Sequence, residues 1–181
     1  MTTRQLTHIT LILLCCLSFA TFAKQQQSEI NLLKAVFIYN FVKFSRWPEE
    51  AWNEQDPAIK ICSIGDDELT ETLVGLHGRT LRDRLVVIER RHSRSKLSSC
   101  HVLYLAKSLQ DKALEICKSL HDMPVLTISE ISDFSKSGGM IELYRMKGRI
   151  KFKINLQITR QAGLDLSSRL LKLAIIVNKQ K

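Results

Sequence analysis

A run of alternating apolar and basic residues at positions 149–154 constrains the fold more than any other segment of this chain. Isoleucine or phenylalanine occupies every second position, and the positions between them are Arg149, Lys151 and Lys153. A two-residue repeat with one charged side is typical of a β-strand that has one buried face and one solvated face. The preceding segment 140–146 is rich in β-forming residues, and Lys147-Gly148 provides glycine where a tight turn requires a positive φ. The sequence therefore predicts a β-hairpin.

Two helices are predicted after this hairpin. Asn155 is a suitable N-cap for a helix that ends at Gln161, and Gly163 suits the position just after its C-terminus. Ser167 is the expected N-cap of the second helix, whose apolar face consists of Leu170, Leu171, Ala174 and Val177.

Upstream of the hairpin, segments with a strand pattern alternate with segments with a helix pattern. The predicted strands are 58–65, 85–89, 101–106 and 124–128. The predicted helices are 28–46 with Ser28 as N-cap, 68–77, 109–120 and a short helix capped by Ser129. This alternation predicts a mostly parallel sheet with helices on both faces, to which the hairpin adds an antiparallel pair at one edge. The expected fold class is a three-layer α/β sandwich.

The N-terminus is expected to be a signal peptide covering residues 1–23. Residues 11–20 form an apolar core that is too short for a comfortable transmembrane span. Small residues place the expected cleavage after Ala23, with a site after Ala20 as the alternative. The remainder, residues 24–181, has the usual size of one domain.

The chain is strongly basic, with a formal net charge of +9 at pH 7. Because the protein is expected to be exported, nucleic acid is not the expected partner. Acidic protein surfaces, anionic lipid and cell-envelope polymers are better candidates. The row of Arg149, Lys151 and Lys153 is interpreted as a docking surface for an acidic partner, or as a solvated face that keeps a sheet edge from pairing with other chains.

The first predicted helix is apolar over most of its circumference. It either packs entirely against the sheet, or it presents part of its apolar surface to a second chain. Phe37 and Phe41 are the candidate contact residues. Trp47 and Trp52 flank the loop that follows, and they are interpreted as core residues, with a ligand cage as the alternative.

Three cysteines remain after the expected cleavage. Cys62 lies in the first predicted strand and Cys100 just before the third; such strands are often neighbours, at a distance that a disulfide can span. A disulfide and two separate buried thiols are both compatible with this pattern. Cys117 is expected to be a buried thiol on a helix, with a cross-chain disulfide as the alternative. Lipid attachment at Cys15 or Cys16 is not favoured, because neither follows a small residue.

The sequence predicts no catalytic residues, no cofactor and no metal site. The histidines show no metal-ligand spacing, and there is no glycine-rich phosphate loop or nucleophile elbow. Asp66-Asp67 is similar to the acidic pocket of a response-regulator receiver domain. However, Ala106-Lys107 stand where that site needs a phosphoacceptor aspartate, so a helix N-cap is the favoured interpretation.

Several motifs in order resemble the YfiR-like family of exported bacterial proteins. They are KAVFIYNFVKFSRWP, ICSIGDDEL, GRTLRDRLVVIER, CHVLYLA, PVLTISEISDF, GGMIELY, RIKFKINL and QAGLDLSSRLLKLA, and they span about residues 30 to 177. Family members carry a cysteine pair in the motifs that contain Cys62 and Cys100. Some members carry a second pair near the final strands, but no cysteine follows Cys117 here, so redox switching through such a pair is not expected.

The resemblance implies a periplasmic repressor that binds the periplasmic sensor region of an inner-membrane diguanylate cyclase and lowers cyclic-di-GMP. It also implies an outer-membrane lipoprotein that sequesters the repressor, and a homodimer. The expected contact surfaces are the first helix and the final strand–helix unit. The alternative hypothesis is a periplasmic small-ligand-binding protein that uses the carboxyl ends of the strands near Gly65 and Ser129.

Overall fold

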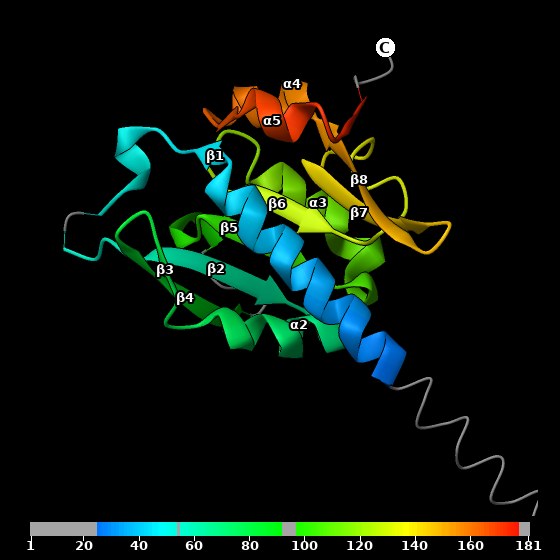
Figure 1. The fold of residues 1–181 in the computed structure, drawn as a ribbon. Coiled ribbons are helices and arrows are strands. Elements are labelled where there is room, and N and C mark those ends of the chain that lie inside the picture. Colours follow the sequence, from blue (N-terminus) through cyan, green and yellow to red (C-terminus); the bar gives the residue numbers. More distant parts are fainter. Residues whose placement is uncertain (1–24, 54, 92–96, 178–181) are drawn as a thin grey trace, which may run out of the picture.

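An eight-stranded sheet forms the middle layer of the computed structural model, which describes residues 25–53, 55–91 and 97–177 (Figure 1). The strand order is β10-β8-β7-β6-β5-β2-β4-β3. Neighbours are parallel except for the β7–β8 and β3–β4 pairs. The strands are β2 (Ile59–Ile64), β3 (Thr80–Leu81), β4 (Arg84–Arg91), β5 (Val102–Leu105), β6 (Leu126–Ser129), β7 (Ile141–Met146), β8 (Arg149–Asn155) and β10 (Ile175–Val177).

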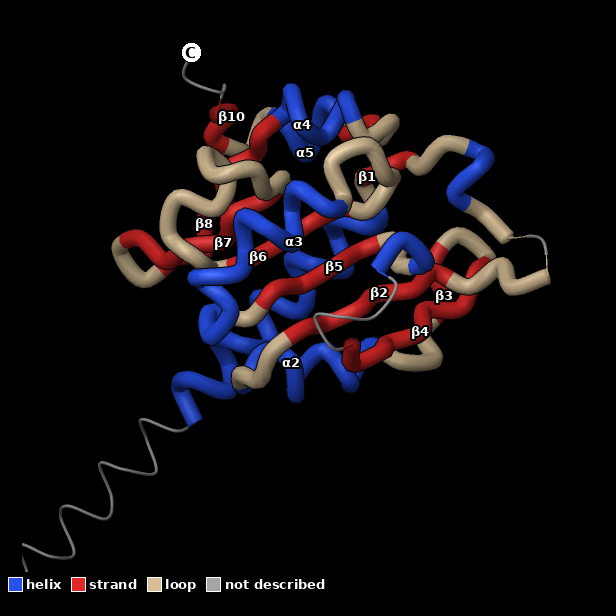
Figure 2. Tube along the Cα trace, turned by 180° about the vertical axis from the view of Figure 1, so that it is seen from behind, coloured by secondary structure: helices blue, strands red, loops and turns tan. Residues whose placement is uncertain are grey.

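Helices cover both faces of this sheet, which confirms the predicted three-layer α/β sandwich. The N-terminal helix (residues 25–43) crosses one face in Figure 1, together with α2 (Glu68–Leu73) and its continuation η2 (Val74–Leu76). On the other face, seen in Figure 2, lie η3 (Leu97–Ser99), η4 (Lys107–Lys112) and α3 (Ala113–Ser119). A separate cluster of buried apolar residues lies under each helix layer. The short helices α4 (Leu156–Gln161) and α5 (Ser168–Leu171) lie beyond the end of β8.

The predicted turn and capping residues have the expected geometry. Lys147 and Gly148 have φ of 49° and 77°, which suits the tight turn between β7 and β8. The side chain of Asn155 accepts a hydrogen bond from the amide of Ile158 at 3.1 Å and so caps α4. Gly163 follows α4 with a φ of 75°, as expected after a helix C-terminus. These local predictions are confirmed.

The N-terminal helix differs from its prediction at both ends. Residues 25–27 are already helical, so Ser28 is not its N-cap. The helix ends at residue 43, and Ser45–Arg46 forms β1, which pairs with β9 (Asp165–Leu166) in a two-stranded sheet. The sequence did not predict this second sheet, because each strand has only two residues and becomes a strand only by pairing with the other. The expected signal peptide, residues 1–23, lies outside the described residues.

One predicted helix is absent, and the final helix is shorter than predicted. Residues 131–138 form bends and turns instead of a helix, and the Ser129 hydroxyl donates to the carbonyl of Leu105 at 2.8 Å. The Ser167 hydroxyl does cap the final helix as expected, because it accepts from the amide of Leu170 at 3.4 Å. The final helix ends at Leu171, and Val177 lies in β10 rather than on a helical face. Residues 175–177 pair with Lys153–Asn155 of β8. Their β-branched side chains and the hydrogen-bonding edge of β8 favour a strand over another helical turn.

Candidate functional site

The β7–β8 hairpin separates the basic row from the core as the sequence predicts. The apolar residues Ile150, Phe152 and Ile154 are buried. Arg149 and Lys151 are exposed, and Lys153 is half-buried. The antiparallel register places Lys151 opposite Tyr144 and Lys153 opposite Glu142 on the solvated face. This face of the hairpin is therefore basic, which is compatible with both a docking surface and a solvated protective face.

Lys153 differs from the other two cations because a carboxylate neutralises it. Its Nζ lies 2.7 Å from Oε1 of Glu142, a residue with only 2% of its surface exposed. The other carboxylate oxygen of Glu142 accepts hydrogen bonds from the amide and hydroxyl of Ser135, at 3.2 and 2.8 Å. Among the described residues, neither Arg149 nor Lys151 forms an ion pair. Within this row, the charge available to a partner therefore comes from Arg149 and Lys151.

The two candidate phenylalanines lie on the opposite face of β8 from the basic row. The ring of Phe41 is 4.9 Å from that of Phe152 and the ring of Phe37 is 6.0 Å from it, measured between centroids. Phe41 has no exposed surface, whereas Phe37 is half-buried. A partner can reach Phe37 in this conformation, but Phe41 belongs to the core. The five candidate contact residues therefore do not form one continuous surface.

The N-terminal helix has a second apolar side that sequence reasoning did not single out by residue. Leu32, Leu33 and Val36 are 60%, 46% and 43% exposed. They lie close together on the helix, since residues three and four positions apart share a face. The sequence signal for this surface was the apolar character of most of the helix circumference, which one sheet cannot cover completely. We call these three residues the outer helix face.

Cys62 and Cys100 form a disulfide, as the spacing of the strands allowed. Cys62 lies in β2, Cys100 lies two residues before β5, and their Cα atoms are 5.9 Å apart. Both residues are buried, so the bond lies in the core under the α3 layer. Cys117 is a free thiol buried on α3, and burial raises its pKa to about 12. It is therefore an unreactive core residue, as predicted.

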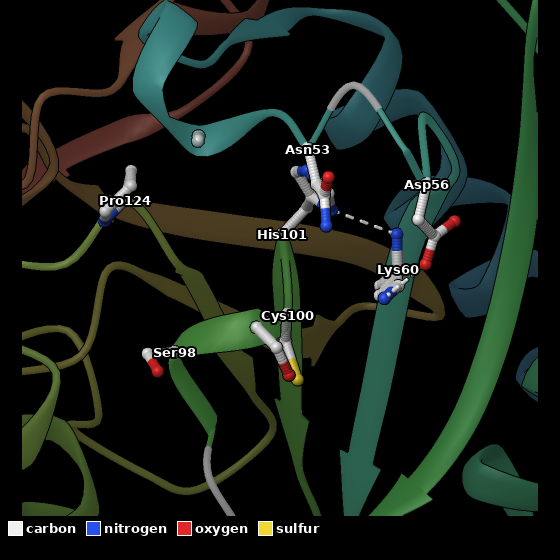
Figure 3. Close-up of a pocket in the computed structure, with 9 residues that line it drawn as sticks. Asn53, Asp56, Lys60, Ser98, Cys100, His101 and Pro124 are labelled. Atoms are coloured by element: carbon white, nitrogen blue, oxygen red, sulfur yellow. Dashed lines mark hydrogen bonds and ion pairs between the residues drawn. The ribbon is translucent and has the colours of Figure 1, made fainter.

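A small cavity at the amino-terminal ends of β2, β5 and β6 is lined by His101, Lys60, Asp56, Asn53 and their neighbours (Figure 3). The amide of Lys60 donates to Nδ1 of His101 at 3.0 Å. The Trp52 ring stacks on the imidazole with centroids 4.5 Å apart. Burial lowers the pKa of His101 to about 4, and the charges of Lys60 and Arg84 act in the same direction. The imidazole is therefore neutral at pH 7.

The two tryptophans belong to this packing, as the favoured interpretation predicted. Trp47 is buried, and its indole N–H donates to the carbonyl of His101 at 3.1 Å. The guanidinium of Arg84 lies 4.0 Å from the centroid of the Trp52 ring. Since these rings contact protein groups, the arrangement is a packed aromatic cluster rather than an open ligand cage.

The carboxyl ends of the strands, where the alternative hypothesis places a ligand, carry several polar contacts. Lys34 Nζ of the N-terminal helix lies 2.7 Å from Oε1 of Glu130. The Tyr104 hydroxyl donates to Asp67 at 2.7 Å, and burial raises the pKa of Tyr104, so this hydroxyl stays protonated. A cavity of about 330 Å³ lies beside these residues. Asp67 also accepts from the amide of Thr70 at 2.8 Å, which confirms its role as a helix N-cap.

Several arginines between β3 and the end of β4 stabilise the fold. The guanidinium of Arg82 donates to the carbonyl of Lys43, the last residue of the N-terminal helix, and to that of Ser45 in β1. Arg84 donates to the carbonyl of Pro57 at 2.9 Å, and Arg90 pairs with Glu71. Because protein groups already pair with these side chains, they are less available to an acidic partner than Arg149 and Lys151.

The described residues contain no group of three or more histidine, cysteine, aspartate or glutamate side chains that could hold a metal ion. Within the same residues, no helix is long and apolar enough to cross a membrane.

A protein-family model described as YfiR/HmsC-like matches residues 31–175, which is about four-fifths of the chain.

Proposed function

The chain belongs to the YfiR/HmsC-like family, and we propose that it binds the periplasmic sensor region of an inner-membrane diguanylate cyclase and holds the enzyme inactive. Family membership supports a periplasmic regulator of a diguanylate cyclase. Direct binding and repression are our extension of that role. The protein then lowers cyclic-di-GMP without performing catalysis itself. Export through a signal peptide cleaved after Ala23 is part of the proposal, and N-terminal sequencing of the mature protein tests it.

The observation that supports binding most directly is the outer helix face. Leu32, Leu33 and Val36 present neighbouring apolar side chains to solvent on a helix whose opposite side is buried. Exposed apolar patches on soluble proteins commonly mark interaction sites. Half-buried Phe37 lies on the same helix and extends the surface toward β8. We propose this face as the protein-binding surface.

Repression follows if the cyclase has an active and an inactive conformation. A partner shifts such an equilibrium only by the difference between its affinities for the two states. A near-complete switch requires a preference of about 10⁴-fold for the inactive state. We further propose that an outer-membrane lipoprotein competes for the repressor and that the repressor is a homodimer, as the family resemblance implies.

The test is cellular cyclic-di-GMP in a strain that lacks the gene, complemented by three forms of the protein. Wild type is expected to restore the low level. Leu32→Glu/Val36→Glu is expected to fail at wild-type abundance, because two carboxylates cannot be buried at an apolar contact. The matched control is Val74→Glu/Leu85→Glu, which changes two apolar residues of similar exposure on other elements and should complement.

Two results would contradict this assignment. If deletion leaves cyclic-di-GMP unchanged while the protein is expressed, the repressor function is wrong. If the helix variant complements as well as its control, repression stands but the outer helix face is not the binding surface. The molar mass of the helix variant in solution shows whether a loss of repression comes from a loss of self-association.

A second candidate function is small-ligand binding at the carboxyl ends of β2, β5 and β6. The cavity of about 330 Å³ there is within the size range of small-molecule sites. However, the Lys34–Glu130 and Tyr104–Asp67 contacts already pair three of the polar side chains that line it. A ligand found by thermal-shift screening, together with no cyclic-di-GMP phenotype, would favour this function.

A further inference from the structure

The tip of the β7–β8 hairpin concentrates positive charge. Four cations, Arg145, Lys147, Arg149 and Lys151, occur within seven residues that include no aspartate or glutamate. All four are exposed. Among the described residues, none of them forms an ion pair, whereas Lys153 farther along β8 is neutralised by Glu142. The positive charge of the tip is therefore not neutralised by ion pairs with the described residues.

An apolar side chain lies among these cations. Met146 is 47% exposed and stands opposite Arg149 in the hairpin register. The next pair on the same face is Tyr144 and Lys151, since residues two positions apart in a strand share a face. This face of the tip therefore alternates cations with Met146 and a half-buried tyrosine.

The tip projects from the molecule. In both views the β7–β8 turn extends away from the helix layers at the end of the sheet (Figures 1 and 2). Lys147 and Gly148 form a tight turn with φ of 49° and 77°, so the hairpin ends in a protruding, convex tip with basic residues on both of its strands. A convex surface contacts an extended peptide poorly, because peptides bind in grooves or along sheet edges. It can approach a flat surface without obstruction.

We propose that this hairpin tip binds anionic phospholipid headgroups, with Met146 entering the interface between headgroups and acyl chains. Basic side chains near an anionic bilayer each contribute about fivefold to binding, and apolar side chains add affinity by burial in the interface. Four cations together are worth on the order of several hundredfold at low salt. The inference goes beyond the proposed function, because it requires no cyclase, and it would hold a repressor close to a membrane-embedded partner.

Vesicle sedimentation with the full mature chain tests the proposal. The probes are phosphatidylcholine vesicles with and without phosphatidylglycerol. Wild type is expected to bind only the anionic vesicles, and less tightly as salt is raised. Lys147→Glu/Arg149→Glu is expected to weaken binding by about 25-fold or more, since two attractive charges become repulsive.

The control must separate the tip from the net charge of a basic protein. Lys112→Glu/Lys118→Glu changes the net charge by the same amount at exposed positions on η4 and α3. This control is expected to lose no more than about threefold, because its positions lie outside the hairpin that carries the proposed contact. Equal losses for the two double variants would overturn the proposal, because binding would then depend on net charge alone. Thermal unfolding of each variant confirms that it is folded.

Two further measurements complete the test. Met146→Ser is expected to weaken binding severalfold even at high salt, where the electrostatic contribution is screened. Binding of a polyglutamate peptide distinguishes an acidic protein partner from lipid. If the tip variant loses peptide binding but still binds anionic vesicles like wild type, the tip recognises an acidic protein segment and the lipid proposal is wrong.

Discussion

Lys153 Nζ and Glu142 Oε1 lie 2.7 Å apart across the β7–β8 hairpin, with the side chain of Lys153 24% exposed and that of Glu142 only 3% exposed. The other carboxylate oxygen of Glu142 accepts hydrogen bonds from the amide and hydroxyl of buried Ser135. The ion pair therefore connects the basic face of the hairpin to the protein interior. One cation of the basic row thus stabilises the fold, while Arg149 and Lys151 remain available to partners.

Lys153→Met is expected to destabilise the protein by about 3 kcal/mol, because it leaves the carboxylate of Glu142 buried without its cation. Lys151→Met is the matched control: Lys151 is exposed on the same strand, so its replacement should change stability by less than about 0.5 kcal/mol. Urea unfolding measures both values. Equal stabilities for the two variants would show that the ion pair contributes little.

Removing the disulfide is expected to cost most of the stability that its loop closure provides. Cys62 and Cys100 are 38 residues apart, for which the loop-entropy relation gives about 4 kcal/mol. Cys62→Ala/Cys100→Ala should therefore unfold at a much lower urea concentration than wild type. Dithiothreitol should destabilise wild type but not the double variant. If the reductant affects both equally, the disulfide is not its target.

Stability is expected to fall as the pH is lowered from about 6.5 to about 4, because the pKa of His101 is about 4 in the folded protein and 6.5 when unfolded. In this interval the unfolded state binds a proton that the folded state does not, so acid favours unfolding. The expected loss is about 3 kcal/mol, complete near pH 4.

The control for this pH dependence is His101→Asn, whose side chain can still accept the hydrogen bond from the Lys60 amide. The variant should lose the part of the pH dependence that lies between pH 4 and 6.5. Urea unfolding at a series of pH values measures this part. An unchanged profile would assign the acid sensitivity to other groups.

Phe41→Ala and Phe37→Ala are expected to separate stability from partner binding. Phe41 is completely buried against Phe152, so its truncation should cost about 3–5 kcal/mol. Phe37 is half-buried beside the outer helix face, and its truncation should cost less while weakening repression. Thermal unfolding and cellular cyclic-di-GMP measure the two effects. If repression falls in both variants only in proportion to the loss of stability, Phe37 is not part of the binding surface.

Much of the fold could be predicted because its signals are local. Three predicted features are confirmed: the alternation between Arg149 and Ile154, the turn at Lys147-Gly148 and the Asn155 cap. Each depends only on residues a few positions apart in the sequence. The disulfide partners could be named because parallel strands place Cys62 and Cys100 near each other. The end of the chain could not be predicted in this way, since β10 exists through its pairing with β8.

By itself, the sequence determined the layer architecture, the hairpin with its basic face and the apolar character of the first helix, because hydrophobic periodicity and turn chemistry act over short distances. Only the tertiary structure decided which residues of each surface are available. It buried Phe41 and left Leu32, Leu33 and Val36 exposed, and it neutralised Lys153 but not Arg149 or Lys151. The physical reason is that burial and ion pairing depend on neighbours from other elements, and periodicity does not specify those neighbours.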